Sequence, residues 1–141
     1  MDINKELDII KRGAEEIIPL EELKNKLKKS HSTGKPLRIK YGIDPTKPDV
    51  HLGHLVPVRK MRFFQDLGHT GVLIIGDYTA QIGDPTGKDE SREALTYEIV
   101  RKNATKYMEQ LFTVLDEKKT EVHFQTEWFS KMSMPLTRCS V

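Results

Sequence analysis

The sequence predicts an α/β fold: the N-terminal half of a doubly wound (Rossmann-type) parallel-sheet nucleotide-binding domain, preceded by two helices. Three short β-type segments, at residues 37–43, 71–76 and 121–126, alternate with helical segments. The middle one is a continuous apolar run, which is typical of a strand buried on both faces of a parallel sheet. This alternation favours parallel strands joined by right-handed crossovers, with ligands bound at the carboxyl ends of the strands.

Two helices are predicted before the sheet, within residues 2–30. Apolar residues recur among charges at helical spacing in both of them: Ile3, Leu7 and Ile10, then Ile17, Leu20, Leu23 and Leu27. Pro19 stands at the start of the second helix, where a missing N–H costs little. The turn-rich residues 30–36 then separate the helices from the first strand.

The two helices between the strands are predicted over residues 52–67 and 96–115. Gly68 stops the first of them. Pro57 lies inside it and removes one backbone hydrogen bond, so we expect a local kink. The second is the longest helical pattern of the chain and carries one broad apolar face.

Size and composition indicate one globular domain. The chain has 141 residues, of which 37% are hydrophobic and 31% charged, and this is enough to bury a core. A net charge of +2 is too small to imply nucleic-acid binding. The single cysteine, Cys139, cannot form an internal disulfide, and no apolar run approaches membrane length, which favours a cytoplasmic location.

Two histidines open the helix that follows the first strand. A helix N-terminus offers backbone N–H groups and a positive dipole end to a phosphate, and Gly53 lets a ligand approach the backbone closely. His51 and His54 fall on one face of the first turn and can donate to the same phosphate oxygens. They lack further partners at metal-ligand spacing, so no protein-bound metal is expected. The other three histidines, His31, His69 and His123, are interpreted as surface or satisfied core residues.

A second polar segment, Gly83-Asp84-Pro85-Thr86-Gly87-Lys88, follows the second strand. It is not a Walker loop, because no hydroxyl residue follows Lys88 to hold magnesium. Asp84 can bind a substrate ammonium, while Lys88 and Arg92 can close over phosphates. The alternative is a tight turn that carries solvated charges.

Taken together, two blocks of the chain resemble bacterial tyrosyl-tRNA synthetases, which are class I aminoacyl-tRNA synthetases. The first block joins Lys40-Tyr41-Gly42-Ile43-Asp44-Pro45-Thr46 to Pro48-Asp49-Val50-His51-Leu52-Gly53-His54 and is similar to the His-Ile-Gly-His region of that class. The second block runs from Ile75 to Lys88, with Arg92 beyond it. Tryptophanyl relatives are expected to lack its Gly-Asp-Pro-Thr-Gly-Lys sequence. The resemblance covers about residues 5–133.

The resemblance implies an ATP-dependent ligase that activates tyrosine as tyrosyl-adenylate and transfers it to tRNA(Tyr). The residues that it assigns to the site fall into three groups: a catalytic group at the phosphates (His51, His54, Thr46, Lys88 and Arg92), an ATP-binding group (Asp44 and Gly53, with both histidines) and a tyrosine-binding group (Asp84, Thr79 and Lys40). Lys40 stands where many members of the family carry a tyrosine that meets the substrate phenol, although a branch of the family also has lysine. ATP is expected as its Mg²⁺ complex, and the full-length form is expected to be a homodimer without membrane contact.

The same resemblance predicts how the chain is organised. Residues 1–36 form an N-terminal helical segment, residues 37–133 the first half of the catalytic domain, and residues 134–141 a tail unlike the family. Ser130-Lys131-Met132-Ser133-Met134 is interpreted as a segment just past the third strand and not as the Lys-Met-Ser-Lys-Ser loop of the family, which is expected in the second half of the fold.

The chain is therefore expected to be a truncated form, inactive by itself. One alternative is a non-catalytic fragment that at most binds nucleotide or a partner. Another is a small His-x-Gly-His nucleotidyltransferase, against which the block from Gly83 to Lys88 argues. Half of a doubly wound sheet would also leave an unpaired hydrophobic edge, so self-association of the chain is predicted.

Overall fold

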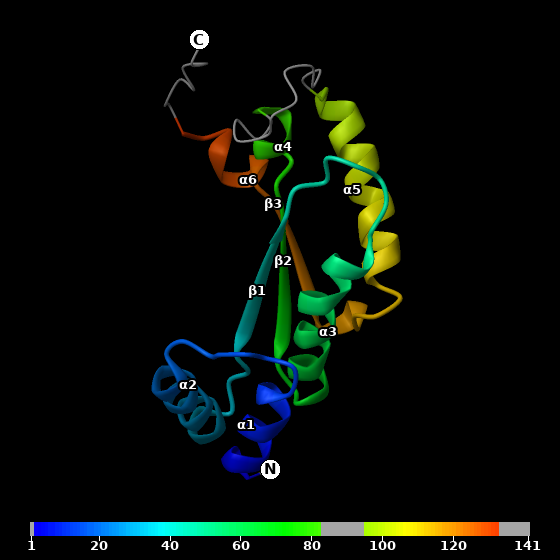
Figure 1. Cartoon of the computed structure of the whole chain (residues 1–141). Helices are drawn as coiled ribbons and strands as arrows, with labels where there is room; N and C mark the ends of the chain where they lie inside the picture. Colours follow the sequence, from blue (N-terminus) through cyan, green and yellow to red (C-terminus); the bar gives the residue numbers. More distant parts are fainter. Residues whose placement is uncertain (1, 83–94, 133–141) are drawn as a thin grey trace.

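A computed structural model describes residues 2–82 and 95–132. Its centre is a parallel sheet of three strands in the order β1 (Arg38–Ile43), β2 (Thr70–Ile75) and β3 (Thr120–Phe124), as Figure 1 shows. The three predicted strands and their parallel pairing are thus confirmed. The third strand ends earlier than predicted, because Thr126 already begins a short helix.

The register of the sheet brings its three carboxyl ends to one level. Ile43 is the partner of Ile75, and Ile75 is in turn the partner of Phe124. The ladder continues one step further, because Gly76 N–H donates to Ile43 C=O over 2.7 Å and Gln125 N–H donates to Ile75 C=O over 3.0 Å. The residues that directly follow the strands therefore share one edge of the sheet.

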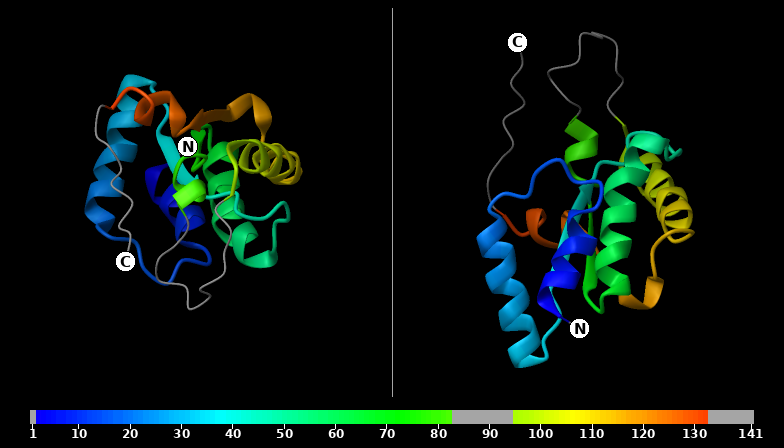
Figure 2. Two further views of the ribbon diagram at one scale, coloured as in Figure 1. Left: turned by 90° about the horizontal axis from the view of Figure 1, so that it is seen from above. Right: turned by 60° about the horizontal axis from the view of Figure 1, so that its bottom comes forward.

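Two long helices, α3 (Leu52–Asp66) and α5 (Tyr97–Leu111), pack against one face of the sheet. Their apolar side chains form the main core with the inward-facing residues of β1 and β2 and with Leu115 beyond α5: Ile43, Val58, Met61, Leu73, Tyr107, Leu111 and Leu115. In Figure 2, α1 (Ile3–Lys11), α3 and α5 lie in a row on this side of the molecule. The predicted alternation of strands and helices is confirmed.

The course of α3 around Pro57 and the C-terminal end of α5 add detail to the prediction. Pro57 lies inside α3, and the helix continues through it to Asp66. The helix α5 ends at Leu111 instead of Leu115. The chain turns back there through hydrogen bonds from the N–H groups of Val114 and Leu115 to Leu111 C=O, and this turn keeps Leu115 in the core.

The N-terminal helices α1 and α2 (Leu20–Thr33) form a second apolar cluster with α3 and the start of β1. Its buried members are Leu7, Ile10, Leu27 and Phe64. The expected break at residues 30–36 was wrong in part, because the helix continues to Thr33. The Ser32 and Thr33 hydroxyls donate back to Lys29 C=O over 3.0 and 2.8 Å, and the helix ends at Gly34, whose φ is 67°.

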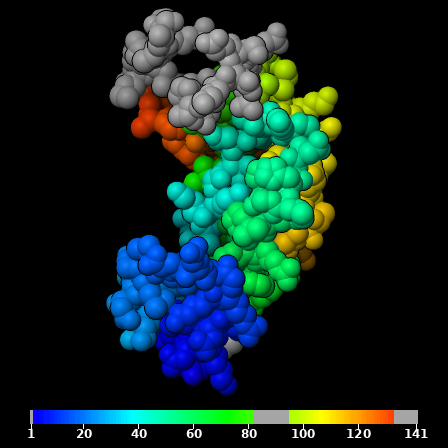
Figure 3. Space-filling view, viewed as in Figure 1, coloured from blue at the N-terminus to red at the C-terminus, as the bar shows by residue number. Residues whose placement is uncertain are grey.

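Short elements complete the described chain: α4 (Thr79–Ile82), the 3₁₀ turn η1 (Glu117–Lys119) and α6 (Thr126–Phe129). Figure 3 shows the surface hollowed between the N-terminal helices in blue and α6 in orange-red. In the part of the chain that the structure describes, we find no helix long and apolar enough to cross a bilayer.

Candidate active site at the carboxyl ends of the strands

The first turn of α3 is closed by its own histidines. His51 is the N-cap residue, and its Nδ1 accepts the Gly53 N–H over 3.1 Å. In return, His51 N–H donates to Nδ1 of His54 over 3.3 Å, so the two side chains form a capping box. The N–H of His54 is also paired, with His51 C=O at 2.9 Å. Because the N–H groups of Gly53 and His54 are taken, fewer backbone donors are free at this turn than the sequence suggested, and the imidazoles add donors to it.

The imidazoles of His51 and His54 lie together, as their spacing predicted. Their ring centroids are 3.7 Å apart, and the ring planes are inclined by 31°. Each Nδ1 accepts a backbone N–H, so each neutral ring carries its proton on Nε2. The pKa of His54 lies below its ordinary value, first because burial disfavours the charged form and second because His51 is close. At neutral pH, His54 is therefore a neutral ring.

Gly53 makes room for one of these rings. A Cβ at this position would lie 3.0 Å from both Cε1 and Nδ1 of His51. The sequence suggested that this glycine lets a ligand approach the backbone. In the structure the space beside it holds the His51 imidazole, so the glycine permits the ring to fold over the start of the helix.

Asp44 and Thr79 meet at the ends of β1 and β2. The Thr79 hydroxyl donates to Asp44 Oδ1 over 2.8 Å, and Thr79 N–H donates to Gln125 Oε1 over 3.2 Å. A Cβ on Gly76 would lie 1.7 Å from Asp44 Oδ1, so only glycine leaves space for this carboxylate. Gln125 follows β3 and was missed by sequence reasoning, although a polar residue directly after a strand was the available signal.

Asp77, which follows Gly76, is a buried carboxylate beside the site that sequence reasoning did not single out. Its side chain is fully buried, and its two oxygens accept the N–H and the hydroxyl of Thr126 over 3.1 and 2.8 Å. Arg101 on α5 lies 3.7 Å from it. This carboxylate therefore joins the end of β2 to the start of α6 and to α5, which indicates a structural role beside the site.

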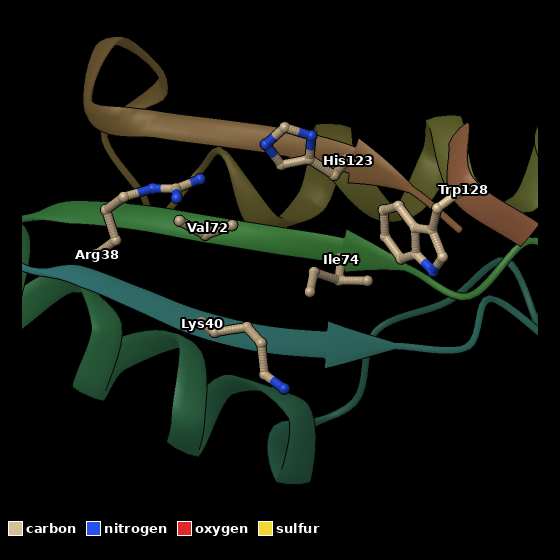
Figure 4. A pocket seen from close by; sticks show the side chains of 6 residues that line it. All are labelled: Arg38, Lys40, Val72, Ile74, His123 and Trp128. Atoms are coloured by element: carbon tan, nitrogen blue, oxygen red, sulfur yellow. The ribbon is translucent and has the colours of Figure 1, made fainter. Parts of the chain in front are cut away.

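An open pocket of about 290 Å³ lies on the sheet face that looks away from α3 and α5. Six residues from all three strands and α6 line it, and Figure 4 shows them: Arg38, Lys40, Val72, Ile74, His123 and Trp128. Its floor is the apolar pair Val72 and Ile74 of β2, and Trp128 forms one wall. The shape and composition suit a flat ring with a polar substituent.

Charges around this pocket are largely paired. Arg38 holds Glu121 through two hydrogen bonds of 3.2 and 2.5 Å, and this contact lowers the pKa of Glu121. His123 lies between Glu127 at 3.1 Å and Glu121 at 3.4 Å, and these carboxylates, Glu127 first, raise the pKa of His123. Lys40 is exposed and makes no ion pair within the described residues. It is therefore the cation that this face offers to a ligand.

Of the remaining predicted site residues, the structure describes only Thr46, and it does not bring this residue to the histidine pair. Thr46 lies in a turn, where its N–H donates to Asp44 C=O over 2.8 Å, and its hydroxyl bonds to neither histidine in the described part of the chain. Asp84, Lys88 and Arg92 lie outside the described residues, as does the expected tail at residues 134–141. Residues 130–132 directly follow α6, as expected for a segment just past the third strand.

Comparison with known proteins assigns the chain to a protein family. A parallel α/β domain with a His-x-Gly-His helix start after its first strand is the arrangement of a class I nucleotide-binding domain. The family model described as tRNA synthetases class I (W and Y) matches residues 32–139. The chain belongs to this family.

Several curated relatives that match the chain bear the name tyrosine–tRNA ligase. The chain is 58% identical over 133 residues to the tyrosine–tRNA ligase of Geobacter metallireducens, covering 94% of this chain and 33% of the relative. It is 55% identical over 132 residues to the one of Carboxydothermus hydrogenoformans, covering 94% of this chain and 32% of the relative. The tyrosyl-tRNA synthetase of Archaeoglobus fulgidus, solved with L-tyrosine, superimposes with a TM-score of 0.71 at 26% identity, over 90% of this chain and 36% of that one. The chain thus spans about a third of the length of the curated relatives it matches.

Proposed function

We propose that this chain carries the ATP-binding and tyrosine-binding half-site of a tyrosine–tRNA ligase. The supporting observation is the close pair of His51 and His54 at the start of the helix that follows β1, together with the contact of Thr79 with Asp44 at the ends of β2 and β1. Relatives that bear the name tyrosine–tRNA ligase match this same segment at 50–58% identity. The proposed reaction makes tyrosyl-adenylate and then transfers the tyrosyl group to tRNA(Tyr).

The chemistry of the first step is an in-line displacement. The tyrosine carboxylate attacks the α-phosphorus of ATP, a new O–P bond forms, and the bond to pyrophosphate breaks. Exposed His51 presents its Nε2–H to the phosphate oxygens that gain charge, with His54 stacked beside it. Lys88, Arg92 and Thr46 belong to the same phosphate group by family resemblance. Positioning and charge stabilisation then supply most of the rate, as in phosphoryl transfer generally, and Mg²⁺ enters as part of the ATP complex.

The tyrosine subsite of the proposal is the open face of the sheet. The apolar floor of Val72 and Ile74 fits the side of a phenol ring, and Trp128 stands at its edge. Lys40 offers an N–H donor to the phenol oxygen, while Thr79 lies at the strand ends and Asp84 is the family's partner for the amino group. In this proposal, Gly53 and Asp44 border the adenylate between the two subsites.

The second candidate is a non-catalytic segment that at most binds nucleotide or a partner. The observation in its favour is the length of the match, about a third of each relative. We expect no tyrosine-dependent ATP–pyrophosphate exchange from the 141 residues by themselves. A small His-x-Gly-His nucleotidyltransferase is the third candidate, and turnover of a phosphopantetheine-type substrate would favour it. The proposed ligase role in translation implies a cytoplasmic location and a homodimeric full-length form.

A chimera tests the ligase proposal directly. Residues 1–133 of this chain replace the matching third of the Geobacter metallireducens relative, and tyrosine-dependent ATP–pyrophosphate exchange is measured. We expect exchange with tyrosine and not with phenylalanine. The His51→Ala chimera should form adenylate more slowly in stopped-flow measurements, with little loss of tyrosine affinity. A chimera that melts cooperatively but supports no exchange would rule out the proposal.

A further inference from the structure

Three polar side chains of α5 hold the segment that carries the histidines. Asn103, Tyr107 and Gln110 are spaced four and three residues apart, so they lie on one side of the helix. Asn103 Nδ2 donates to Pro45 C=O over 3.2 Å. Gln110 Nε2 donates to Pro48 C=O over 3.0 Å, and its Oε1 accepts the Val50 N–H over 3.0 Å. Each partner lies in the connection between β1 and α3.

The connection needs such partners. Residues 44–51 contain neither helix nor strand, so their backbone groups have no ladder to join. Gln110 both donates to this segment and accepts from it, as a neighbouring strand would. Asn103 is only 8% exposed, and a buried amide is costly unless it is hydrogen-bonded. These contacts therefore fix the path of the segment that leads into His51.

Tyr107 contacts the histidine pair itself. Its hydroxyl oxygen lies 3.1 Å from Nδ1 and 3.2 Å from Nε2 of His54, while the residue is only 3% exposed. His51 N–H donates to Nδ1 of His54, and the Tyr107 hydroxyl can donate its own proton to the same nitrogen, so the proton of the neutral ring is on Nε2. Burial raises the pKa of Tyr107, so its hydroxyl stays protonated at neutral pH.

We propose that Tyr107 is a positioning residue that holds His54 in its Nε2–H tautomer and stacked on His51, with Asn103 and Gln110 fixing the segment that carries the pair. Tyr107 acts through His54, so it is not a catalytic residue. The inference rests on the proposed function only in assigning the pair to ATP. The tautomer of His54 can be measured without any nucleotide.

The test is ¹⁵N NMR of the imidazoles in the 141-residue chain, with His54 assigned by a His54→Gln variant. The wild type should show one neutral tautomer of His54, protonated at Nε2. In Tyr107→Phe, which keeps the buried ring, we expect both tautomers of His54. Tyr97→Phe is the matched control, since it removes a hydroxyl from the same helix without touching His54, and it should leave the spectrum unchanged.

Two results would overturn the proposal. One is a wild-type spectrum in which neutral His54 is protonated mainly at Nδ1, a result that can be obtained from the wild type alone. The other is a folded Tyr107→Phe that keeps the single Nε2–H tautomer. An ATP titration separates this inference from the proposed function: we expect Tyr107→Phe to weaken ATP binding about three- to tenfold, the cost of one hydrogen bond. A wild type that binds no ATP would count against the nucleotide site, whereas the tautomer would still decide the role of Tyr107.

Discussion

At the scale of single residues, Gly76 shows how closely the strand ends are packed. It is buried, and the carboxylate of Asp44 occupies the space where a side chain would begin. Gly42, on the neighbouring strand, has open space instead, since a Cβ there would meet only Ile74 C=O at 4.0 Å. We therefore expect substitution by alanine to lower the stability of the fold at Gly76 but not at Gly42.

Gly76→Ala should destabilise the fold by about 1–3 kcal/mol, because the new methyl group forces Asp44 and Thr79 apart. Gly42→Ala is the control, and we expect no loss, because alanine is no worse than glycine in a strand. Urea unfolding measures both variants. Equal stability of Gly76→Ala and the wild type would show that the Asp44 carboxylate does not occupy this space.

A second prediction at this scale concerns His123. Glu127, and then Glu121, raise its pKa above the ordinary value, so Glu127→Gln should lower this pKa. Because the folded-state pKa is the higher one, this contribution to stability is complete below the unfolded-state pKa. It is lost as the pH rises through the folded-state pKa. NMR titration of the imidazole measures the effect, with Glu117→Gln as a control remote from His123; an unchanged pKa in Glu127→Gln would contradict the assigned cause.

At the scale of elements, one buried carboxylate ties the N-terminal helices to the sheet. Glu6 on α1 is 1% exposed, and it contacts His31 of α2 at 2.6 Å and His69, just before β2, at 2.8 Å. His69 Nδ1 also accepts the Leu37 N–H over 3.3 Å. Periodicity placed Ile3, Leu7 and Ile10 on the inner face of α1 but gave no signal for a buried charge.

Glu6→Ala should cost about 1–3 kcal/mol of stability, because it leaves the buried His69 ring without its partner. Glu22→Ala is the matched control. Glu22 pairs with Lys26 at 2.6 Å, but both side chains are more than half exposed, so the loss should stay below about 1 kcal/mol. Thermal or urea unfolding compares the two variants, and similar losses would argue against the buried cluster as an anchor of α1 and α2.

The ends of α2 and α5 show where the local sequence pattern was insufficient to predict a helix boundary. Serine and threonine at residues 30–33 are typical of a turn, but in α2 the hydroxyls of Ser32 and Thr33 bond back to the carbonyl of Lys29. Leu115 belongs to the apolar face that predicted a helix to residue 115, and it is indeed buried, yet it reaches the core from a turn. The helix α2 thus ends only at Gly34, and α5 ends in a turn that its backbone hydrogen bonds close.

At the scale of the whole molecule, the sheet is covered unequally. The long helices lie on one face, while the other carries the open pocket with Ile74 and the exposed Trp128. Within the described residues, β1 and β3 each have a strand neighbour on one side only. Unpaired edges and an open apolar face favour pairing with a second copy.

We therefore predict that the 141-residue chain self-associates as its concentration rises, and that Ile74→Lys reduces this association. Ile99→Lys is the control, since Ile99 is an exposed apolar residue of α5, 46% exposed and away from the pocket. Sedimentation velocity over a concentration series measures the effect. A monomer that unfolds cooperatively at every concentration would contradict the prediction.

The sequence by itself determined the order of the elements, the parallel sheet, the pairing of His51 with His54 and the resemblance to a family. These follow from local rules, because periodicity sets strands and helices and two residues three apart share a helix face. Only the tertiary structure decided which distant residues complete the site. Tyr107 lies 53 residues from His54 in the chain, and Gln125 lies 46 from Thr79. Such contacts depend on how α5 and β3 pack against β1 and β2, which no local pattern specifies.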